Sequence, residues 1–416
     1  MKAKFSVLAA CLAVACATVA QAGDRLYFTQ DSGSNDTISK VNSLTRGVMG
    51  GGIGSEAGFA AGGTGTDNLG DIAAANINGT PVIATAGNVI HTWDADINFV
   101  NVTDVNGGAP DVPIREIAVG EMGGNADRLV IARETDLAST NIFVQIYEAT
   151  TLTNLHNPGP HANIGNATGL TLGDFDSTLP GREIGIGTTD LATLNKSPGF
   201  QLYVRGDNGN WLGQQPLNQP ISDVASGDLV PGVNSDEMIL TGNIGGDPGP
   251  GFGQQSHVFS RTSGGGIAYQ FENGGGGPHG PGGLLFNAVD VGQLDADPEP
   301  EIVLVGNDVV RVLNHDGSFV FQTGPTNQNF VDVVIADAMD DDGVNEIVAV
   351  SDSGLVFAYG HSVIGDASSA FSGGTLGFFS GGAAYTAVTA LNPVPEPTTA
   401  LLMLLASVGA VGFRRR

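Results

Sequence analysis

Three turns of this chain carry carboxylates at closely spaced, mostly alternate positions. The three sets are Asp295, Asp297 and Glu301; Asp340, Asp342 and Glu346; and Asp174, Asp176 and Glu183. In a tight turn, alternate side chains and carbonyls point toward one centre, and hard divalent cations prefer such groups of oxygens. The same residues would equally suit a turn held by Asx-type hydrogen bonds without any metal. The spacing therefore predicts either cation-binding loops or self-bonded acidic turns.

Each acidic turn lies between two short apolar segments, and this unit recurs along the chain. Six copies occupy residues 72–87, 117–132, 170–187, 224–242, 289–306 and 333–350. Equivalent turn positions are 45, 53, 54, 65 and 45 residues apart, a period typical of propeller blades. The longest spacing indicates an insertion at residues 243–283, where glycine-rich runs flank a hairpin and predict a mobile surface loop.

Further strands complete these units. Segments 309–314 and 318–323 flank a His-Asp-Gly turn, which predicts a hairpin and hence four strands per unit. Segments 25–30 and 37–42 lack a first strand, whereas residues 383–391 lack partners. Joined together, they make a seventh unit that hides its edge strands. The sequence therefore predicts an all-β fold, a seven-bladed β-propeller closed by strands from both ends. A six-bladed ring or an open β array is the alternative.

The first 22 residues resemble a secretory signal. Lys2 and Lys4 precede the apolar run 5–19, and Ala22 ends a small-x-small pattern that predicts cleavage before Gly23. A lipoprotein box at residues 8–11 is the alternative, although it would leave an apolar run of only six residues. Both cysteines of the chain lie within this leader, so the mature protein would have no disulfide and no thiolate metal site.

The chain is strongly acidic. Its formal charge is −27, and loss of a leader that carries two lysines and no acidic residue makes it −29. Such a surface repels nucleic acid and anionic lipid head groups and favours cations and basic partners. With 63 glycines and 6% aromatic residues, the composition fits short strands joined by tight turns.

The third, fifth and sixth copies resemble the FG-GAP or VCBS repeat of integrin-type propellers and bacterial surface proteins. The segments are DFDSTLPGREIGIG, QLDADPEPEIVLVG and AMDDDGVNEIVAV, and the resemblance covers residues 70–360. In that family, a D-x-D-x-D-G-x-x-D turn binds calcium, and the fold serves mostly adhesion and ligand binding. The resemblance thus implies calcium in the fifth and sixth turns and leaves the third open.

This sequence departs from the family pattern at several positions. Gln293 and Ala338 replace the first aspartate of the fifth and sixth turns, and Pro298 replaces the glycine of the fifth. The third turn has one extra residue before Glu183. Where calcium binds, we expect it to stiffen a loop and not to take part in chemistry.

No catalytic motif emerges from the sequence. The histidines lack HExxH or HxH spacing, and no G-x-S-x-G nucleophile elbow is present. Paired carboxylates arise readily in so acidic a chain, so they are weak support for a glycosidase. Trp93 and Trp211 could stack on sugars, but packing between blades is the favoured interpretation. We predict no enzyme; a secreted propeller lyase or glycosidase acting on polysaccharide is the alternative.

The last 23 residues combine three ordered parts. Val394 precedes a Pro-Glu-Pro sequence formed by Pro395, Glu396 and Pro397, residues 398–413 carry no charge, and Arg414, Arg415 and Arg416 follow. A helix of 16 residues would be about 24 Å long, enough for a thin bilayer, with the arginines on the cytoplasmic side. This order resembles the PEP-CTERM sorting signal of Gram-negative bacteria, which implies cleavage by a membrane exosortase.

The sequence thus predicts three parts: a signal peptide at 1–22, a propeller at 23–393 and a sorting tail at 394–416. The expected function is binding or adhesion at the cell surface or in the extracellular matrix, after transient anchoring in the inner membrane. Expected partners are an exosortase and either polysaccharide or surface proteins, with no nucleic acid.

Overall fold

The computed structural model describes most of the region between residues 24 and 391. The described ranges are 24–31, 37–45, 54–60, 69–105, 114–122, 125–134, 142–157, 160–161, 166–189, 200–204, 208–216, 221–241, 255–260, 267–272, 286–295, 297–323, 326–338, 344–360, 378–380 and 384–391. Within these ranges all regular elements are strands. The all-β prediction is therefore confirmed for the part of the chain that the structure describes.

The described strands form seven antiparallel sheets. The first sheet combines β29 (Ala384–Leu391), β1 (Arg25–Asp31), β2 (Thr37–Thr45) and β3 (Gly54–Ala60). The second contains β4 (Asp71–Ile77), β5 (Thr80–Ala86), β6 (Ile90–Trp93) and β7 (Phe99–Thr103). The third contains β8 (Ile114–Met122), β9 (Asn125–Glu134), β10 (Ile142–Glu148), β11 (Asn154–His156) and β12 (Pro160–His161).

Four more sheets follow in chain order. They contain β13 (Asn166–Gly173), β14 (Glu183–Thr189), β15 (Phe200–Val204) and β16 (Trp211–Pro216); then β17 (Asp223–Gly227), β18 (Glu237–Thr241), β19 (Gln255–Ser260) and β20 (Ile267–Glu272). The last two contain β21 (Phe286–Gly292), β22 (Glu301–Gly306), β23 (Val309–Leu313) and β24 (Phe319–Gln322); and β25 (Phe330–Ala336), β26 (Glu346–Ser351), β27 (Leu355–Tyr359) and β28 (Phe378–Ser380).

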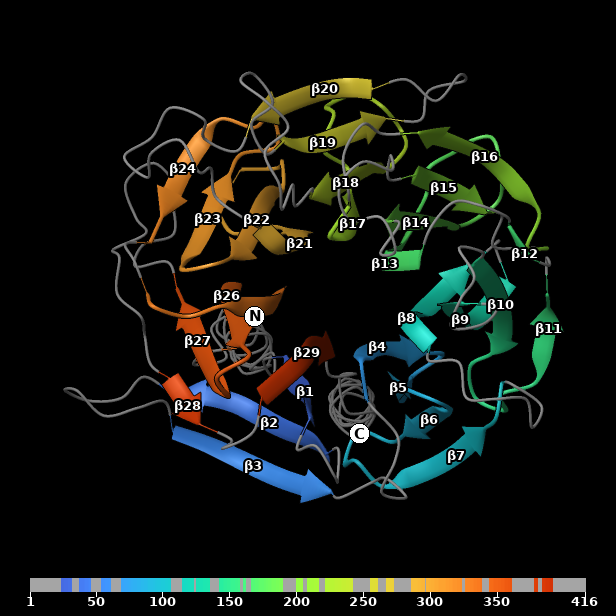
Figure 1. The fold of residues 1–416 in the computed structure, drawn as a ribbon, viewed down its shortest axis with the longest axis horizontal. Helices are drawn as coiled ribbons and strands as arrows, with labels where there is room; N and C mark the ends of the chain where they lie inside the picture. Colours follow the sequence, from blue (N-terminus) through green and yellow to red (C-terminus); the bar gives the residue numbers. More distant parts are fainter. Residues whose placement is uncertain are drawn as a thin grey trace, which may run out of the picture.

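The sheets are arranged around a common centre, with the first strand of each sheet nearest to it (Figure 1). The inner strands β29, β4, β8, β13, β17, β21 and β25 each contact the next, and β25 also contacts β29. Each sheet buries both faces against its neighbours. One apolar cluster joins Phe28 and Tyr385 of the first sheet to Val348 of the last, for example.

Glycines on the inner strand and on the strand beside it, such as Gly169 on β13 and Gly185 on β14, permit this close packing. A Cβ atom at Gly169 would lie 2.5 Å from the backbone nitrogen of Val224, on the inner strand of the next sheet. One at Gly185 would lie 2.2 Å from the side chain of Met238. Real Cβ atoms do not approach so closely, which accounts for part of the high glycine content.

Residues from both ends of the described chain share the first sheet. Leu26 lies opposite Ala390 and Phe28 opposite Val388, so β29 forms the inner edge of a sheet whose other strands come from the N-terminal part. Buried Trp93 belongs to the same apolar cluster as Tyr27 at the seam with the second sheet, in agreement with its predicted packing role.

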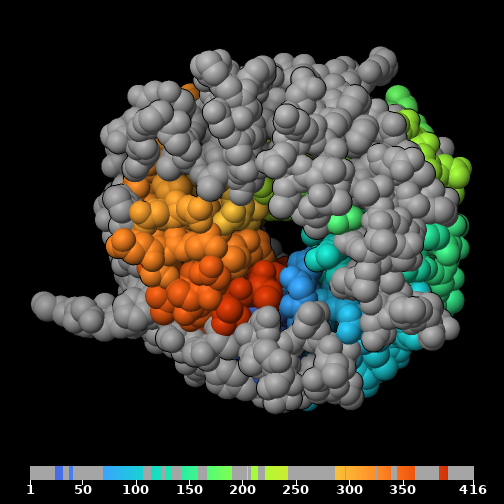
Figure 2. Space-filling view, in the orientation of Figure 1, coloured from blue at the N-terminus to red at the C-terminus, as the bar shows by residue number. Residues whose placement is uncertain are grey.

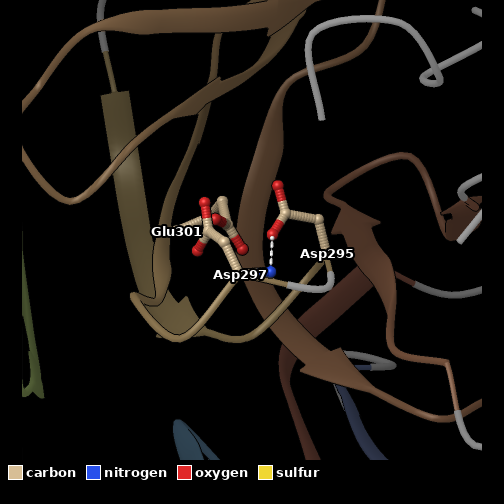
Figure 3. Close-up of side chains that lie close together, drawn as sticks. All are labelled: Asp295, Asp297 and Glu301. Carbon is tan, nitrogen blue, oxygen red and sulfur yellow. Dashed lines mark hydrogen bonds between the residues drawn. The ribbon is translucent and has the colours of Figure 1, made fainter. Parts of the chain in front are cut away.

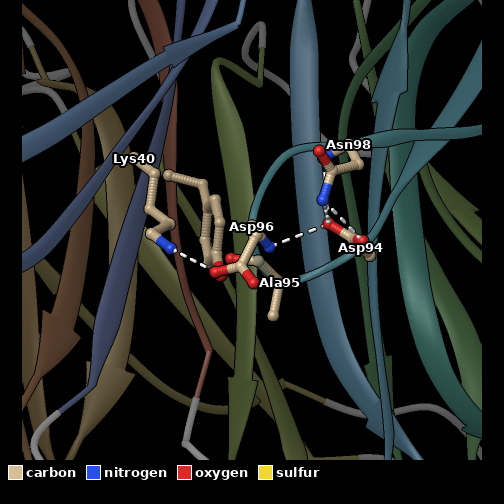
Figure 4. Close-up of polar contacts among 6 residues, drawn as sticks. Lys40, Asp94, Ala95, Asp96 and Asn98 are labelled. Carbon is tan, nitrogen blue, oxygen red and sulfur yellow. Dashed lines mark hydrogen bonds and ion pairs between the residues drawn. The ribbon is translucent and has the colours of Figure 1, made fainter.

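Polar contacts reinforce this seam (Figure 4). Lys40 Nζ lies 2.8 Å from Asp96 Oδ1, and Tyr27 donates a hydrogen bond of 2.9 Å to the carbonyl of Ala95. Asp94 Oδ1 accepts the backbone N–H groups of Asp96 and Asn98, both at 2.9 Å, which holds the turn in place. The terminal sheet is thus fixed to its neighbour by specific side chains as well as by apolar packing.

The interpretation of residues 243–283 as an insertion needs correction. Two strands within this segment, β19 and β20, pair with each other, and β19 pairs with β18. They are the third and fourth strands of their own sheet, so the hairpin is part of the repeat. The glycine-rich runs on either side account for the long spacing.

Among the described residues, no helix has the length and apolar character needed to cross a membrane. The predicted leader with its Ala22–Gly23 cleavage position, the tail with its predicted helix at 398–413, and two of the predicted calcium ligands, Asp340 and Asp342, lie outside the described residues.

Candidate metal centre

The turn between β21 and β22 brings one predicted set of ligands together (Figure 3). Carboxylate oxygens of Asp295, Asp297 and Glu301 all lie within 4.8 Å of one another. Two oxygens bound to one calcium ion can be at most about 5 Å apart, because each Ca–O distance is about 2.5 Å. The geometry of this group is thus compatible with a calcium ion. In the part of the chain that the structure describes, no other group of three acidic, histidine or cysteine residues meets this criterion.

The same turn is also held by its own hydrogen bonds. Asp295 Oδ1 accepts the N–H of Asp297 at 2.9 Å, and Asp297 Oδ1 accepts the N–H of Glu299 at 3.0 Å. The Gln293 amide donates to the carbonyls of Asp295 and Asp297. Gln293 therefore ties the turn from the position where the calcium motif has an aspartate. With one oxygen each, the three carboxylates supply fewer ligands than the six to eight that calcium prefers, so water would complete the coordination.

Glu301 belongs to a structural pattern that recurs in four sheets. At the start of the second strand, a buried glutamate accepts the backbone N–H of the preceding turn through Oε2. The pairs are Asp176 with Glu183 at 3.0 Å, Leu229 with Glu237 at 2.8 Å, Leu294 with Glu301 at 2.6 Å and Ala338 with Glu346 at 3.0 Å. The predicted ligands Glu183, Glu301 and Glu346 thus share a turn-closing role with Glu237, a residue that the sequence did not single out.

Burial and neighbouring charge act together on Glu301. Burial, followed by the charges of Asp295 and Asp297, raises its pKa to about 7, although the hydrogen bond from Leu294 opposes this shift. A cation beside the three carboxylates would relieve both effects and favour the ionised form.

The third turn does not assemble its predicted set. Thr178 stands where the fifth turn has Asp297, and it donates its backbone and hydroxyl hydrogen bonds to Asp176 Oδ1. Asp174 Oδ1 is buried without a hydrogen-bond partner, and burial, the charge of Asp236 and that of Asp176 raise the pKa of Asp174. Burial raises the pKa of Glu183 to about 7.

A second group of carboxylates, which the sequence prediction missed, faces the centre of the ring. Asp71, Asp223 and Asp332 stand at or near the start of inner strands β4, β17 and β25. In each, Oδ1 accepts the N–H of the following residue, while Oδ2 accepts an N–H from the inner strand of the next sheet. The second contacts are Asp71 to Ile117 at 2.8 Å, Asp223 to Val289 at 2.9 Å and Asp332 to Val388 at 2.7 Å. Asp290 links β21 to Ile335 in the same way at 2.7 Å.

Glu116 stands between these aspartates, and no hydrogen bond joins its carboxylate to another residue that the structure describes. It lines a cavity of about 190 Å³ together with Asp71, Asp223, Asp332 and the neighbouring Arg115, and Figure 2 shows a hollow at the centre of the ring. Burial, then the charges of Asp71, Asp223 and Asp332, raises the pKa of Glu116 well above its usual range. An acidic residue just before the apolar run of an inner strand is the sequence signal that could have revealed the group.

A comparison with protein-family models decides the nature of the tail. Residues 393–416 match the model of the PEP-CTERM protein-sorting motif. The chain ends in a PEP-CTERM motif. This match confirms the prediction for Pro395, Glu396, Pro397 and the three terminal arginines as a motif, and it implies export and recognition by an exosortase. No FG-GAP or VCBS repeat model matches, so that resemblance stays a hypothesis.

Solved structures support the fold of the part that precedes the PEP-CTERM motif. The structure of the Dos1 propeller aligns at 10% identity with a TM-score of 0.50, covering 87% of this chain and 88% of that one. BBS1N, solved in complex with ARL6DN, aligns at 13% identity with a TM-score of 0.50, covering 80% of this chain and 90% of that one. At such low identity the likeness concerns the fold alone, which is a β-propeller. No curated protein matches the sequence.

Proposed function

We propose that this chain is a seven-bladed propeller, closed by strands from both ends, that acts as a non-enzymatic binding or adhesion module. It works at the surface or in the extracellular matrix of a Gram-negative bacterium. The observation that carries the proposal is the PEP-CTERM motif at residues 393–416, which directs a propeller to export and exosortase processing. Residues 1–22 are the signal peptide, 23–393 the propeller and 394–416 the sorting tail, with a membrane helix at 398–413.

The central cavity supports binding over catalysis. Asp71, Asp223 and Asp332 each have both carboxylate oxygens bound to backbone N–H groups, so they serve as ties between sheets. The cavity of about 190 Å³ is smaller than the roughly 300–1,000 Å³ of small-molecule sites, whereas a second cavity of about 450 Å³, lined by Thr171, Ser226 and Asp290 among others, falls within that range. That second cavity is therefore the described place where a sugar unit would fit.

A glycan array probed with residues 23–393 tests this function. We expect retention of one or more extracellular polysaccharides without any change in their chain length. Release of reducing ends or unsaturated sugars would contradict the non-enzymatic assignment and favour a lyase or glycosidase.

Calcium is proposed as a structural ion in the turn that holds Asp295, Asp297 and Glu301, and in the sixth turn with Asp340 and Asp342. Support comes from the distances within the fifth turn and from the raised pKa of Glu301. The third turn, with Asp174 and Asp176, is the weaker candidate because its oxygens do not converge.

Sorting is tested by changing all three terminal arginines to alanine. We expect the variant to accumulate at the membrane as a longer, unprocessed form, because the cytoplasmic charge that positions the tail is lost. Equal processing of the variant and the natural chain, measured by immunoblot of membrane and medium, would argue for a plain anchor.

A further inference from the structure

Both ends of the folded domain leave it at the same face of the ring. Leu391, the last residue of β29, lies opposite Arg25 at the start of β1. The preceding residue, Asp24, donates its N–H to the carbonyl of Asp337 at 2.6 Å, and its Oδ2 accepts the N–H of Asp337 at 3.1 Å. Asp337 directly follows inner strand β25, so β25 and β29 end at the same level.

The turns that follow the inner strands meet along this face. Asp236 donates its N–H to the carbonyl of Asp174 at 2.7 Å, which links the fourth and fifth sheets. Asn345 Nδ2 donates to the carbonyl of Gln293 at 2.8 Å, which links the sixth and seventh. We call this surface the turn face; it comprises residues 174–182, 228–236, 293–295, 297–300, 337–338 and 344–345.

The turn face is strongly acidic. Its residues include eight carboxylates and one basic side chain, Arg182, and Asp24 and Arg25 lie beside them at the start of β1. The acidic residues are Asp174, Asp176, Asp228, Asp236, Asp295, Asp297, Glu299 and Asp337. Asp228 and Asp297 are exposed.

Only residues 392–397 separate Leu391 from the uncharged segment that begins at Thr398. Six fully extended residues reach about 20 Å at most, which is less than the width of a domain of this size. We infer that the turn face is the membrane-facing surface of the anchored precursor and that cleavage of the tail exposes it. This inference rests on the proposed membrane anchoring of the tail.

The charge of the face shapes its contact with the bilayer. An acidic surface next to anionic head groups is repelled within about one Debye length, roughly 8 Å at physiological salt. Divalent cations screen this repulsion and so bring the face closer to the lipid. Contacts made through the acidic turns become available to other partners only after processing.

A single-thiol accessibility experiment tests this orientation. The mature chain, residues 23–416, contains no cysteine and is reconstituted into liposomes that contain anionic lipid. Asp228→Cys places a thiol on the turn face, and Asp104→Cys places one after β7, at the opposite end of the strands. Both positions are exposed, so the two variants are matched.

Each variant is treated with a bulky polyethylene-glycol maleimide and compared with the same chain ended at residue 393. We expect the anchored Asp228→Cys protein to react several-fold more slowly than its tail-free form, whereas Asp104→Cys reacts equally in both. A flexible Gly/Ser insertion of about 20 residues after Asn392 should abolish the difference, because it lifts the domain away from the bilayer.

Two outcomes would overturn the inference, and they are distinguishable. If the full chain does not float with liposomes, the anchor itself is wrong and the orientation fails with it. If the chain floats but tail removal does not change the rate of Asp228→Cys relative to Asp104→Cys, the anchor stands and the orientation is wrong.

Discussion

At the scale of single residues, Glu116 offers the clearest test of the carboxylates around the centre of the ring. Asp71, Asp223 and Asp332 face it from three other inner strands, and Arg115 adjoins it as the opposing charge. Because the Glu116 carboxylate makes no hydrogen bond to any described residue, Glu116→Gln removes charge without removing a link between strands. We expect a higher melting temperature for this variant at pH 8, measured by circular dichroism.

The pH dependence of stability follows from the same group. Burial raises the pKa of Asp332 from 3.8 to about 8 and that of Asp71 to about 6, so the folded state holds protons that the unfolded chain releases. Stability is therefore highest below about pH 4 for these groups and falls as the pH rises toward 8. Glu116→Gln should flatten this slope, whereas Asp316→Asn should not, because hydrogen bonds to Ser318 lower the pKa of Asp316. An identical slope in Glu116→Gln would contradict the repulsion argument.

Variants of Glu301 and Glu237 distinguish a role in metal binding from a role in closing the turn by hydrogen bonds. Both are buried and accept backbone N–H groups, but only Glu301 lies beside two further carboxylates whose oxygens converge. Glu301→Gln should abolish the rise in melting temperature that calcium produces in the natural chain, whereas Glu237→Gln should keep it. Differential scanning fluorimetry with calcium or chelator measures both.

Each variant loses one carboxylate oxygen, so both should melt somewhat lower than the natural chain without calcium. If chelator does not change the melting temperature of the natural chain, the proposal of a calcium ion in this turn is wrong.

At the scale of elements, the hydrogen bonds between aspartates and the backbone of the next inner strand can be tested at Asp332. Asp332→Ala removes the acceptor of the Val388 N–H and so loosens β29 from β25. Loss of such a partly buried hydrogen bond costs about 1–3 kcal/mol. We expect faster hydrogen exchange at the Val388 amide, measured by NMR.

The matched change Asp316→Ala, in the turn between β23 and β24, should leave exchange at Val388 unchanged. Protection of Val388 that survives Asp332→Ala would show that apolar packing alone holds the strand.

The repeated strands could be predicted from the sequence, because alternating apolar residues and Asp/Gly turns determine strands and hairpins through neighbours that are close in sequence. The hairpin of β23 and β24 and the positions of β21 and β22 follow that pattern. The convergence of Asp295, Asp297 and Glu301 was also predictable from spacing. The third turn does not bring its predicted carboxylates together, because Thr178 supplies no carboxylate where the fifth turn has Asp297 and because Glu183 comes one residue later in the turn.

The hydrogen bonds by which Asp71, Asp223 and Asp332 link neighbouring inner strands could not be predicted from local sequence. Each hydrogen bond depends on a partner about 46 to 66 residues away on the next sheet. That partner can be identified only when the arrangement of the strands in space is known. The hairpin of β19 and β20 was misassigned for a related reason. The glycine-rich runs on either side suggested an insertion, whereas both strands belong to the same sheet as β17 and β18.

At the scale of the whole molecule, β29 is the last described element, and it ends shortly before the sorting motif. Tyr385, Val388 and Leu391 are buried against the sheets on either side. We therefore predict that the propeller needs every residue through β29 and none of the tail in order to fold.

Two truncations test that claim most directly, by thermal unfolding and size-exclusion chromatography. The chain ended at residue 393 should remain monomeric and melt at the temperature of the full chain in detergent. The chain ended at residue 383 should lose cooperative unfolding and aggregate, because β1 becomes an exposed inner edge. Cooperative unfolding of the shorter chain at the same temperature would contradict the account.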